Sequence, residues 1–260
     1  MPVPADALTS RLERIQQALG VEADGVLGPE TLTALETRLQ IRASKRAVSL
    51  ECSRLSLDLI LKFEVGSRTR YEKEFQRPVW PGASSGVTIG IGYDLGLTSK
   101  ADIIADWRPW LSEPQLAALA AVQGVCGAAA RQLAQGVRHV LIPLEAAEQV
   151  FHTRTLPAFA ALTRSRFAGV EKLPPDAQGM LLSLVYNRGA SLKGPRRREM
   201  AQIAALLRRP DPKLDDIADQ LESMKRLWPD YKGLRDRRQR EADVIRAADR
   251  TYAVDELVRV

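Results

Sequence analysis

Glycines alternate with β-branched residues over one short stretch of the chain, Val87-Thr88-Ile89-Gly90-Ile91-Gly92-Tyr93-Asp94. β-branched side chains favour a strand, whereas glycine weakens a strand and marks a bend or the close approach of another group to the backbone. We therefore predict a short β-element here, with its backbone bare on one side. After Leu97 the sequence has helical periodicity almost throughout, so the predicted class is α+β, mostly α.

Residues that cap or break helices indicate where the helices begin and end. One helix is predicted from about Ser49 to Glu64, followed by a segment from Gly66 to Gly86 without helical pattern. Long irregular segments of this kind in compact domains often carry function. Further helices are predicted to start at Thr98-Ser99, Ser112-Glu113-Pro114 and Pro174-Pro175-Asp176, and to cover residues near 196–208, 213–227 and 232–249.

Two apolar stripes of helical spacing flank the segment Asp24-Gly25-Val26-Leu27-Gly28-Pro29-Glu30-Thr31. This segment resembles the loop of a peptidoglycan-binding module whose hallmark is Asp-Gly-x-x-Gly-Pro-x-Thr. The resemblance covers about residues 6–42 and implies a small all-α module with signature residues Asp24, Gly25, Gly28 and Thr31. A polar linker follows, so the predicted domains are 1–46 and 47–260. A helical hairpin that only packs on the main domain is the alternative.

The charge and the rare residue types limit the classes of function. The net charge of +6 favours an anionic partner, namely nucleic acid, a membrane surface or an acidic cell-wall polymer, but no nucleic-acid recognition motif is present. The only histidines, His139 and His152, lack partners at ligand spacing, so we expect no metal and no cofactor. Cys52 and Cys126 lie far apart in the sequence and form no metal-binding spacing.

Glu64, Thr88 and Asp94 are the candidate catalytic residues around the β-element. Glu64 follows an apolar run at a predicted helix end, where the helix dipole and apolar neighbours favour the protonated form that a general acid needs. Glycoside hydrolysis usually needs a second carboxylate, which Asp94 supplies, and the Thr88 hydroxyl can align the attacking water. Because Thr88 and Asp94 are six residues apart, strand alternation places both on one face.

Four ordered motifs resemble the phage-type (T4-like) lysozyme family over residues 49–248. They are Phe63-Glu64-Val65-Gly66, Thr88-Ile89-Gly90-Ile91-Gly92-Tyr93, Leu184-Val185-Tyr186-Asn187-Arg188-Gly189 and Gly233-Leu234-Arg235-Asp236-Arg237-Arg238-Gln239-Arg240-Glu241. The resemblance implies a lysozyme-like fold, with a small β-hairpin element on a helical bundle. It also implies that Glu64 is the general acid, that Thr88 lines the catalytic water, and that an arginine of the last motif pairs with Glu64. We assign this pairing to Arg238, with Arg237 as the second choice.

The second carboxylate departs from the common pattern of that family. The common enzymes have an aspartate six residues before the threonine, and this position is Gly82 here. The chain instead resembles the pesticin-like branch, in which the aspartate follows the threonine, as Asp94 does. Glu72 and Glu74 in the irregular segment are the alternatives for this role.

The resemblance implies an N-acetylmuramidase, a glycoside hydrolase that cleaves the β-1,4 bond between N-acetylmuramic acid and N-acetylglucosamine in peptidoglycan. The expected substrate-binding residues are Tyr71, Trp80, Gly90, Gly92, Tyr93, Asn187 and Arg238; core or rim packing is an equal alternative for the three aromatic residues. A lytic transglycosylase, which works with one glutamate, and a non-catalytic peptidoglycan-binding protein are the alternative functions.

Partners and location follow from the absence of targeting signals. The N-terminus has no basic region followed by an apolar run, and no segment is long and apolar enough to span a membrane. We expect a monomer, made in the cytoplasm without a signal peptide, that makes no stable membrane insertion. It would act in the periplasm or cell wall as an endolysin after holin release, or as an antibacterial effector delivered by a secretion system. An immunity protein or a secretion-system carrier is the further partner expected in that case.

Overall fold

The computed structural model describes residues 5–21, 23–25, 31 and 50–260. The chain divides into two compact units, Met1–Val48 and Ser49–Val260. In the first unit the described part contains helix α1 (Ala5–Leu19) and residues of the loop that follows it. The second helix predicted for this module and Gly28 lie outside the described residues.

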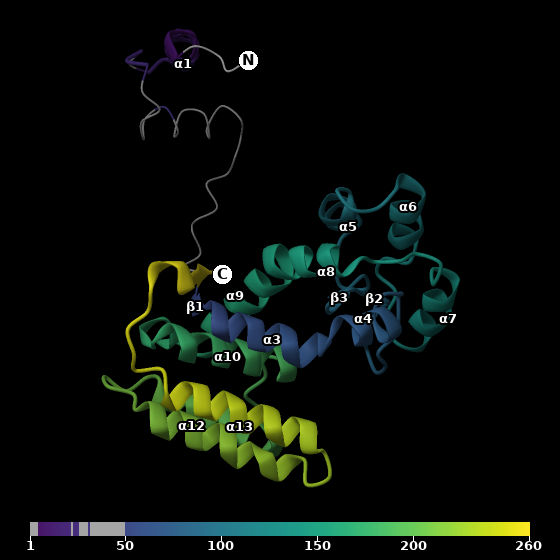
Figure 1. The fold of residues 1–260 in the computed structure, drawn as a ribbon. Coiled ribbons are helices and arrows are strands. Elements are labelled where there is room, and N and C mark those ends of the chain that lie inside the picture. Colours follow the sequence, from purple (N-terminus) through teal and green to yellow (C-terminus); the bar gives the residue numbers. More distant parts are fainter. Residues whose placement is uncertain (1–4, 22, 26–30, 32–49) are drawn as a thin grey trace. The chain divides into compact units, whose positions relative to one another are not determined.

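The second unit is mostly helical and contains two small antiparallel sheets (Figure 1). Its strands are β1 (Glu51–Ser53), β2 (Thr88–Ile89), β3 (Tyr93–Asp94) and β4 (Leu257–Arg259). Its α-helices are α3 (Arg54–Val65), α4 (Arg68–Glu74), α5 (Lys100–Trp107), α6 (Glu113–Ala121), α7 (Ala128–Gly136), α8 (Leu144–Val150), α9 (Leu156–Arg166), α10 (Pro175–Arg188), α11 (Arg198–Leu206), α12 (Leu214–Ser223) and α13 (Lys232–Arg246). The predicted class, α+β and mostly α, is therefore confirmed.

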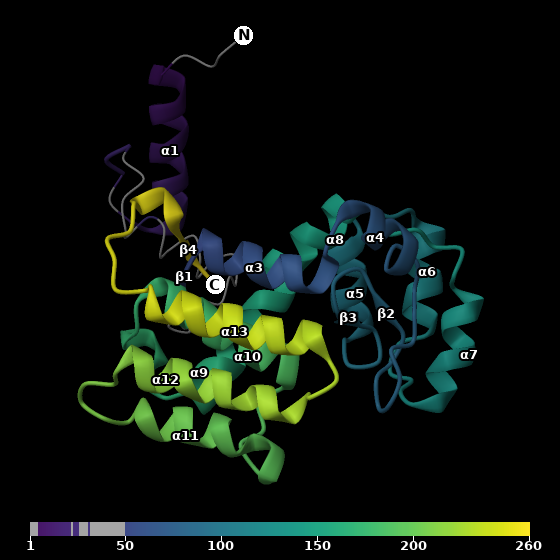
Figure 2. The ribbon, with the colours of Figure 1, turned by 60° about the horizontal axis from the view of Figure 1, so that its bottom comes forward.

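Helix α3 connects two groups of elements within this unit. Helices α4 to α7 and the hairpin of β2 and β3 gather beyond its C-terminal end, while α10 packs along its other part and α11 to α13 lie on the same side as α10 (Figures 1 and 2). A second connection runs through α8, a π-helical turn (Phe151–Thr155) and α9, which follow one another without a break. Helix α10 is the centre of the bundle, since all ten residues from Asp176 to Val185 are buried.

The helix starts and the β-element agree with the sequence-based expectations. Helices α6 and α10 begin directly after Ser112 and Pro174, and Ser99 caps α5 by accepting a hydrogen bond from a backbone N–H. In the hairpin, Thr88 lies opposite Asp94 and Ile89 opposite Tyr93.

Two local predictions were wrong. Residues 51–53, expected to be helical, form β1, which pairs with the C-terminal strand β4 in the register Glu51 with Arg259. The helix starts only after Ser53, whose side chain accepts from the N–H of Ser56. The segment expected to be irregular contains α4, which Ser67 caps in the same way.

Candidate active site

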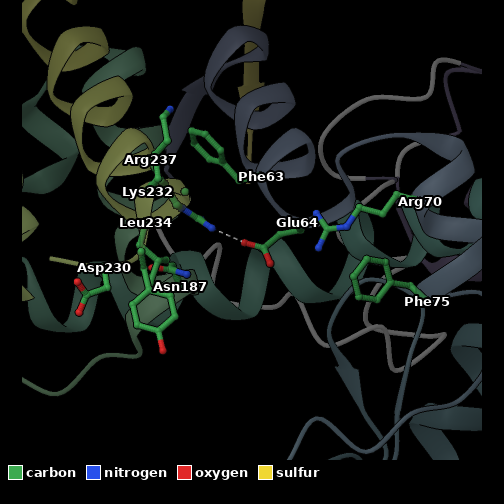
Figure 3. A pocket seen from close by; sticks show the side chains of 11 residues that line it. Phe63, Glu64, Arg70, Phe75, Asn187, Asp230, Lys232, Leu234 and Arg237 are labelled. Atoms are coloured by element: carbon green, nitrogen blue, oxygen red, sulfur yellow. Dashed lines mark hydrogen bonds and ion pairs between the residues drawn. The ribbon is translucent and has the colours of Figure 1, made fainter. Parts of the chain in front are cut away.

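Glu64 lies in the last turn of α3, where the chain turns at Gly66 with a φ of +75°. Its Oε1 atom is 2.6 Å from Nη1 of Arg237 on α13, and its side chain keeps 27% of its surface exposed. Figure 3 shows the carboxylate directed toward Arg237, with Arg70 and Phe75 on its other side. The sequence therefore brings a partly accessible carboxylate and a buried cation together from elements 173 residues apart.

The arginine that pairs with Glu64 is Arg237, so the assignment to Arg238 was wrong. Successive residues of a helix point about 100° apart, so only one of two neighbouring arginines can face α3. Arg238 is fully buried, donates to Glu241 at 2.8 Å and to Asn187 at 3.3 Å, and lines neither of the two cavities beside Glu64. Burial lowers the pKa of Arg238 to about 10, although the charge of Glu241 opposes this shift.

Glu64 lines two cavities. The smaller, of about 260 Å³, extends beneath the hairpin and is lined by Val65, Tyr71, Phe75, Val79, Pro81, Thr88, Gly90, Ile91, Gly92 and Tyr186 besides Glu64. The larger, of about 600 Å³, extends toward the start of α13 and is lined by Phe63, Arg70, Phe75, Asn187, Asp230, Tyr231, Lys232, Gly233, Leu234 and Arg237 besides Glu64. Figure 3 shows this larger cavity. Both cavities also share Phe75, so the glutamate stands at the junction of an apolar space and a charged one.

Thr88 lines the smaller cavity with Glu64, but Asp94 is not among the residues that line either cavity. The Asp94 carboxylate accepts from the backbone N–H of Gly86 at 3.1 Å and from that of Gly96 at 2.8 Å. The Thr88 hydroxyl donates to the carbonyl of Gly86 at 3.4 Å. Asp94 therefore holds together the backbone that carries Thr88, and both of its carboxylate oxygens are engaged by backbone N–H groups.

The aromatic candidates for sugar stacking have partners in the core. Tyr71 lines the smaller cavity but is fully buried, and its hydroxyl donates to the carbonyl of Ile142. Tyr93 packs edge-on against Trp107, and its hydroxyl donates to Asp106 at 2.8 Å. Trp80 donates its ring N–H to the carbonyl of Ser85 and lines neither cavity. These contacts agree with the alternative considered for the three aromatic residues, namely core or rim packing.

The glycines of the hairpin make room for neighbouring side chains. Gly92 has a φ of +71°, and a Cβ atom there would lie 2.3 Å from the hydroxyl of Tyr186. A Cβ atom on Gly90 would lie 3.1 Å from Ala147 and from Trp107. Gly90 and Gly92 both line the smaller cavity, so the bare backbone predicted from the sequence is part of its wall.

Sequence reasoning missed several residues of the site. Tyr186 lines the smaller cavity, and its hydroxyl donates to the carbonyl of Ile91; burial and the charge of Glu64 raise its pKa. Arg70, Asp230 and Lys232 place charged groups around the larger cavity next to Asn187, which was predicted. The position of Tyr186 inside a family motif was a signal that could have identified it.

In the first unit, Gln16 organises the loop of signature residues. Its amide nitrogen donates to the Asp24 carboxylate at 2.6 Å and to the Thr31 hydroxyl at 3.0 Å, and its oxygen accepts from the N–H of Gly25 at 2.8 Å. Gln16 and Thr31 are almost fully buried. These signature residues therefore stabilise the loop through hydrogen bonds to Gln16. Their spacing in the sequence did not reveal this role.

The described residues offer neither a metal site nor a helical membrane span. They contain no cluster of three or more His, Cys, Asp or Glu side chains that could hold a metal ion. None of the helices in the described part is long and apolar enough to cross a membrane.

Comparison with known proteins finds one stretch of this unit that is similar to a sequence family. No curated protein matches the chain. Residues 60–164 match the family model described as a domain of unknown function (DUF8812), a segment that contains Glu64 and the hairpin but ends before α10 and α13.

Proposed function

We propose that the second unit is a peptidoglycan glycosidase of the N-acetylmuramidase type with a lysozyme-like fold, and that Glu64 is its general acid. The observation that carries this proposal is the position of Glu64, a partly exposed carboxylate at the junction of two cavities. A glycan chain has polar edges and apolar ring faces, which match the charged cavity on one side and the apolar cavity on the other. Glu64 would protonate the glycosidic oxygen between them.

We assign to Thr88 the role of orienting the attacking water molecule. It shares the smaller cavity with Glu64, and its hydroxyl can accept from a water molecule while it donates to the carbonyl of Gly86. We assign Asp94 to holding the hairpin that carries Thr88, because its oxygens already accept backbone hydrogen bonds. In this proposal the water is oriented by a hydroxyl rather than by a second carboxylate.

The position of Asp94 also favours a second candidate function, a lytic transglycosylase. Such enzymes work with one glutamate and close an anhydro ring on the muramic acid instead of adding water. The smaller cavity contains Glu64 as its only carboxylate among the described residues. The two candidate functions share the substrate and the general acid. They differ in the muramic end of the product, which is reducing after hydrolysis and anhydro after transglycosylation.

We propose further that the first unit binds peptidoglycan and raises the local concentration of the enzyme on an insoluble substrate. The basic net charge would favour an anionic cell envelope. The chain would reach the wall by holin release or by a secretion system, and in the second case would require an immunity protein in the producing cell.

Mass spectrometry of digested peptidoglycan tests the proposal. The wild-type chain should release fragments with reducing muramic ends; anhydro-muramic ends would favour the transglycosylase instead. Glu64→Gln should abolish release while the fold persists, since the amide keeps the shape but cannot donate the proton. Glu113→Gln is the matched control, because Glu113 is an exposed glutamate that pairs with Arg108 and lines neither cavity. Fragment release by Glu64→Gln at the wild-type rate would refute the assignment.

A further inference from the structure

The guanidinium of Arg237 is held by a different acceptor group at each of its three nitrogens. Nη1 donates to Glu64 at 2.6 Å, Nε donates to Glu241 at 3.2 Å, and Nη2 donates to the hydroxyl and carbonyl oxygens of Ser183 at 2.9 and 3.3 Å. The ring of Phe63 covers the group, with its centroid 4.8 Å from the guanidinium carbon. A planar group fixed at three corners and one face has a single orientation.

Glu241 is the centre of this arrangement, although it lies behind the site and has no exposed surface. Its Oε1 atom accepts from Ser183 at 2.6 Å and from Arg238 at 2.8 Å, in addition to Arg237. Each of these donors comes from α10 or α13, so the carboxylate connects the two helices. A buried carboxylate is costly unless it is paired and hydrogen-bonded; here Oε1 takes all of these contacts, while the buried Oε2 atom has no hydrogen-bond partner.

The charges around Glu64 are close to balanced. Two carboxyl groups, those of Glu64 and Glu241, stand against two guanidinium groups, those of Arg237 and Arg238. The other charged or titratable groups that face Glu64 are Tyr186 from α10 and Arg70, Asp230 and Lys232 around the larger cavity. Arg70 is exposed and pairs with Glu74 at 2.9 Å, so its charge is already partly compensated.

We propose that Glu241 is a positioning residue for the acid, which acts by orienting Arg237 and by offsetting the positive charge that Arg237 presents to Glu64. Without this second carboxylate, Glu64 would be the remaining carboxylate near the charges of two buried arginines, of which Arg237 contacts it directly, and its ionised form would be favoured too strongly for a general acid. The inference rests on the proposed role of Glu64, but its test does not require catalysis.

The test is the titration of the Glu64 side chain, followed by carbon-13 NMR in the full chain with labelled glutamate, with Glu64→Gln used to assign the signal. In Glu241→Gln the amide keeps the shape and loses the charge, so the midpoint of the Glu64 titration should move to lower pH by on the order of one unit. If the chain lyses cell walls, the alkaline limb of its pH–rate profile should move to lower pH by the same amount. A wild-type chain without lytic activity would refute the proposed function and leave this titration result readable.

Glu199→Gln is the matched control. Glu199 is also fully buried and pairs with two arginines, Arg226 at 2.8 Å and Arg198 at 3.1 Å, but it lies on α11 and lines neither cavity. This variant should lose stability and leave the Glu64 midpoint unchanged.

Glu241→Asp covers the case in which Glu241→Gln does not fold. The aspartate keeps the charge that buried Arg238 needs but withdraws the carboxylate from Arg237 by one methylene group. We expect a smaller shift of the Glu64 midpoint in the same direction. A Glu64 midpoint equal to that of the wild type in whichever of the two variants folds would overturn the proposal.

Discussion

Nη1 of Arg237 lies 2.6 Å from Oε1 of Glu64, and this ion pair joins the second turn of α13 to the last turn of α3. The two helices lie at opposite ends of the second unit in sequence, and they are also connected through the pairing of β1 with β4. The strand β1 leads directly into α3, and β4 follows α13 after a short segment. The site therefore forms where the first and the last segments of the second unit contact each other.

Arg237→Met should move the alkaline limb of lytic activity to higher pH. The guanidinium favours the ionised form of Glu64, so its removal lets the acid keep its proton as the pH rises. Glu241 retains Ser183 and Arg238 as donors, so we expect a stability loss on the order of 1–3 kcal/mol and not unfolding. The measurement is lysis rate against pH, together with chemical denaturation.

Arg246→Met is the control for this change, because Arg246 lies on the same helix and pairs with Asp219 and Glu222 on α12, away from both cavities. It should cost about 1 kcal/mol or less and leave the pH profile unchanged. An unchanged profile in Arg237→Met would contradict the role of the Glu64 pair.

Asp94→Asn should reduce stability more than it reduces turnover at low temperature. The carboxylate accepts from the N–H groups of Gly86 and Gly96, and the amide keeps only one acceptor oxygen without the charge. We expect a loss of about 1–3 kcal/mol in the free energy of unfolding. The comparison with Glu64→Gln decides between a supporting and a catalytic role. Complete loss of lysis at wild-type stability would restore Asp94 as the second catalytic carboxylate.

Gly92→Ala should destabilise the hairpin and narrow the smaller cavity. A methyl group there meets the Tyr186 hydroxyl at 2.3 Å, and the φ of +71° is itself unfavourable for alanine. Gly124→Ala separates these two effects, because Gly124 has a similar φ of +79° with no atom within 4 Å. We expect about 1 kcal/mol for the backbone strain in both variants and a further 1–3 kcal/mol only in Gly92→Ala. Equal losses in thermal denaturation would argue against the contact with Tyr186.

Local patterns predicted the parts of the site that depend on neighbouring residues. The alternation of glycine with β-branched residues predicted a short β-element, and the apolar run before Gly66 predicted that Glu64 would end a helix. Both follow from periodicity or capping within about ten residues. Alternation along a single strand was the wrong basis for pairing Thr88 with Asp94, because the two residues lie opposite each other on β2 and β3.

The rest depends on contacts that sequence spacing does not record. The choice between Arg237 and Arg238 needs the rotational phase of α13 relative to α3, which packing of the whole bundle sets. The direction of the Asp94 carboxylate depends on two backbone N–H groups in the adjoining loops. The strand at residues 51–53 exists only because the other end of the chain pairs with it.

The stability of the second unit should depend on pH through Cys52 in alkaline solution. Burial raises the pKa of the Cys52 thiol to about 12, from an ordinary value of about 9. Because the folded state holds the proton more tightly than the unfolded state, this contribution is complete below pH 9 and is lost as the pH rises toward 12. The stability of the wild type relative to Cys52→Ala should therefore fall by about 1.4 kcal/mol between pH 8 and pH 10.

Urea denaturation at the two pH values measures this difference, and the comparison cancels the ionisation of the tyrosines that both chains share. Cys126→Ala is the control, since it retains Cys52 and should keep the wild-type dependence. A constant difference between wild type and Cys52→Ala across this range would mean that the thiol ionises in the folded protein as readily as in the unfolded chain.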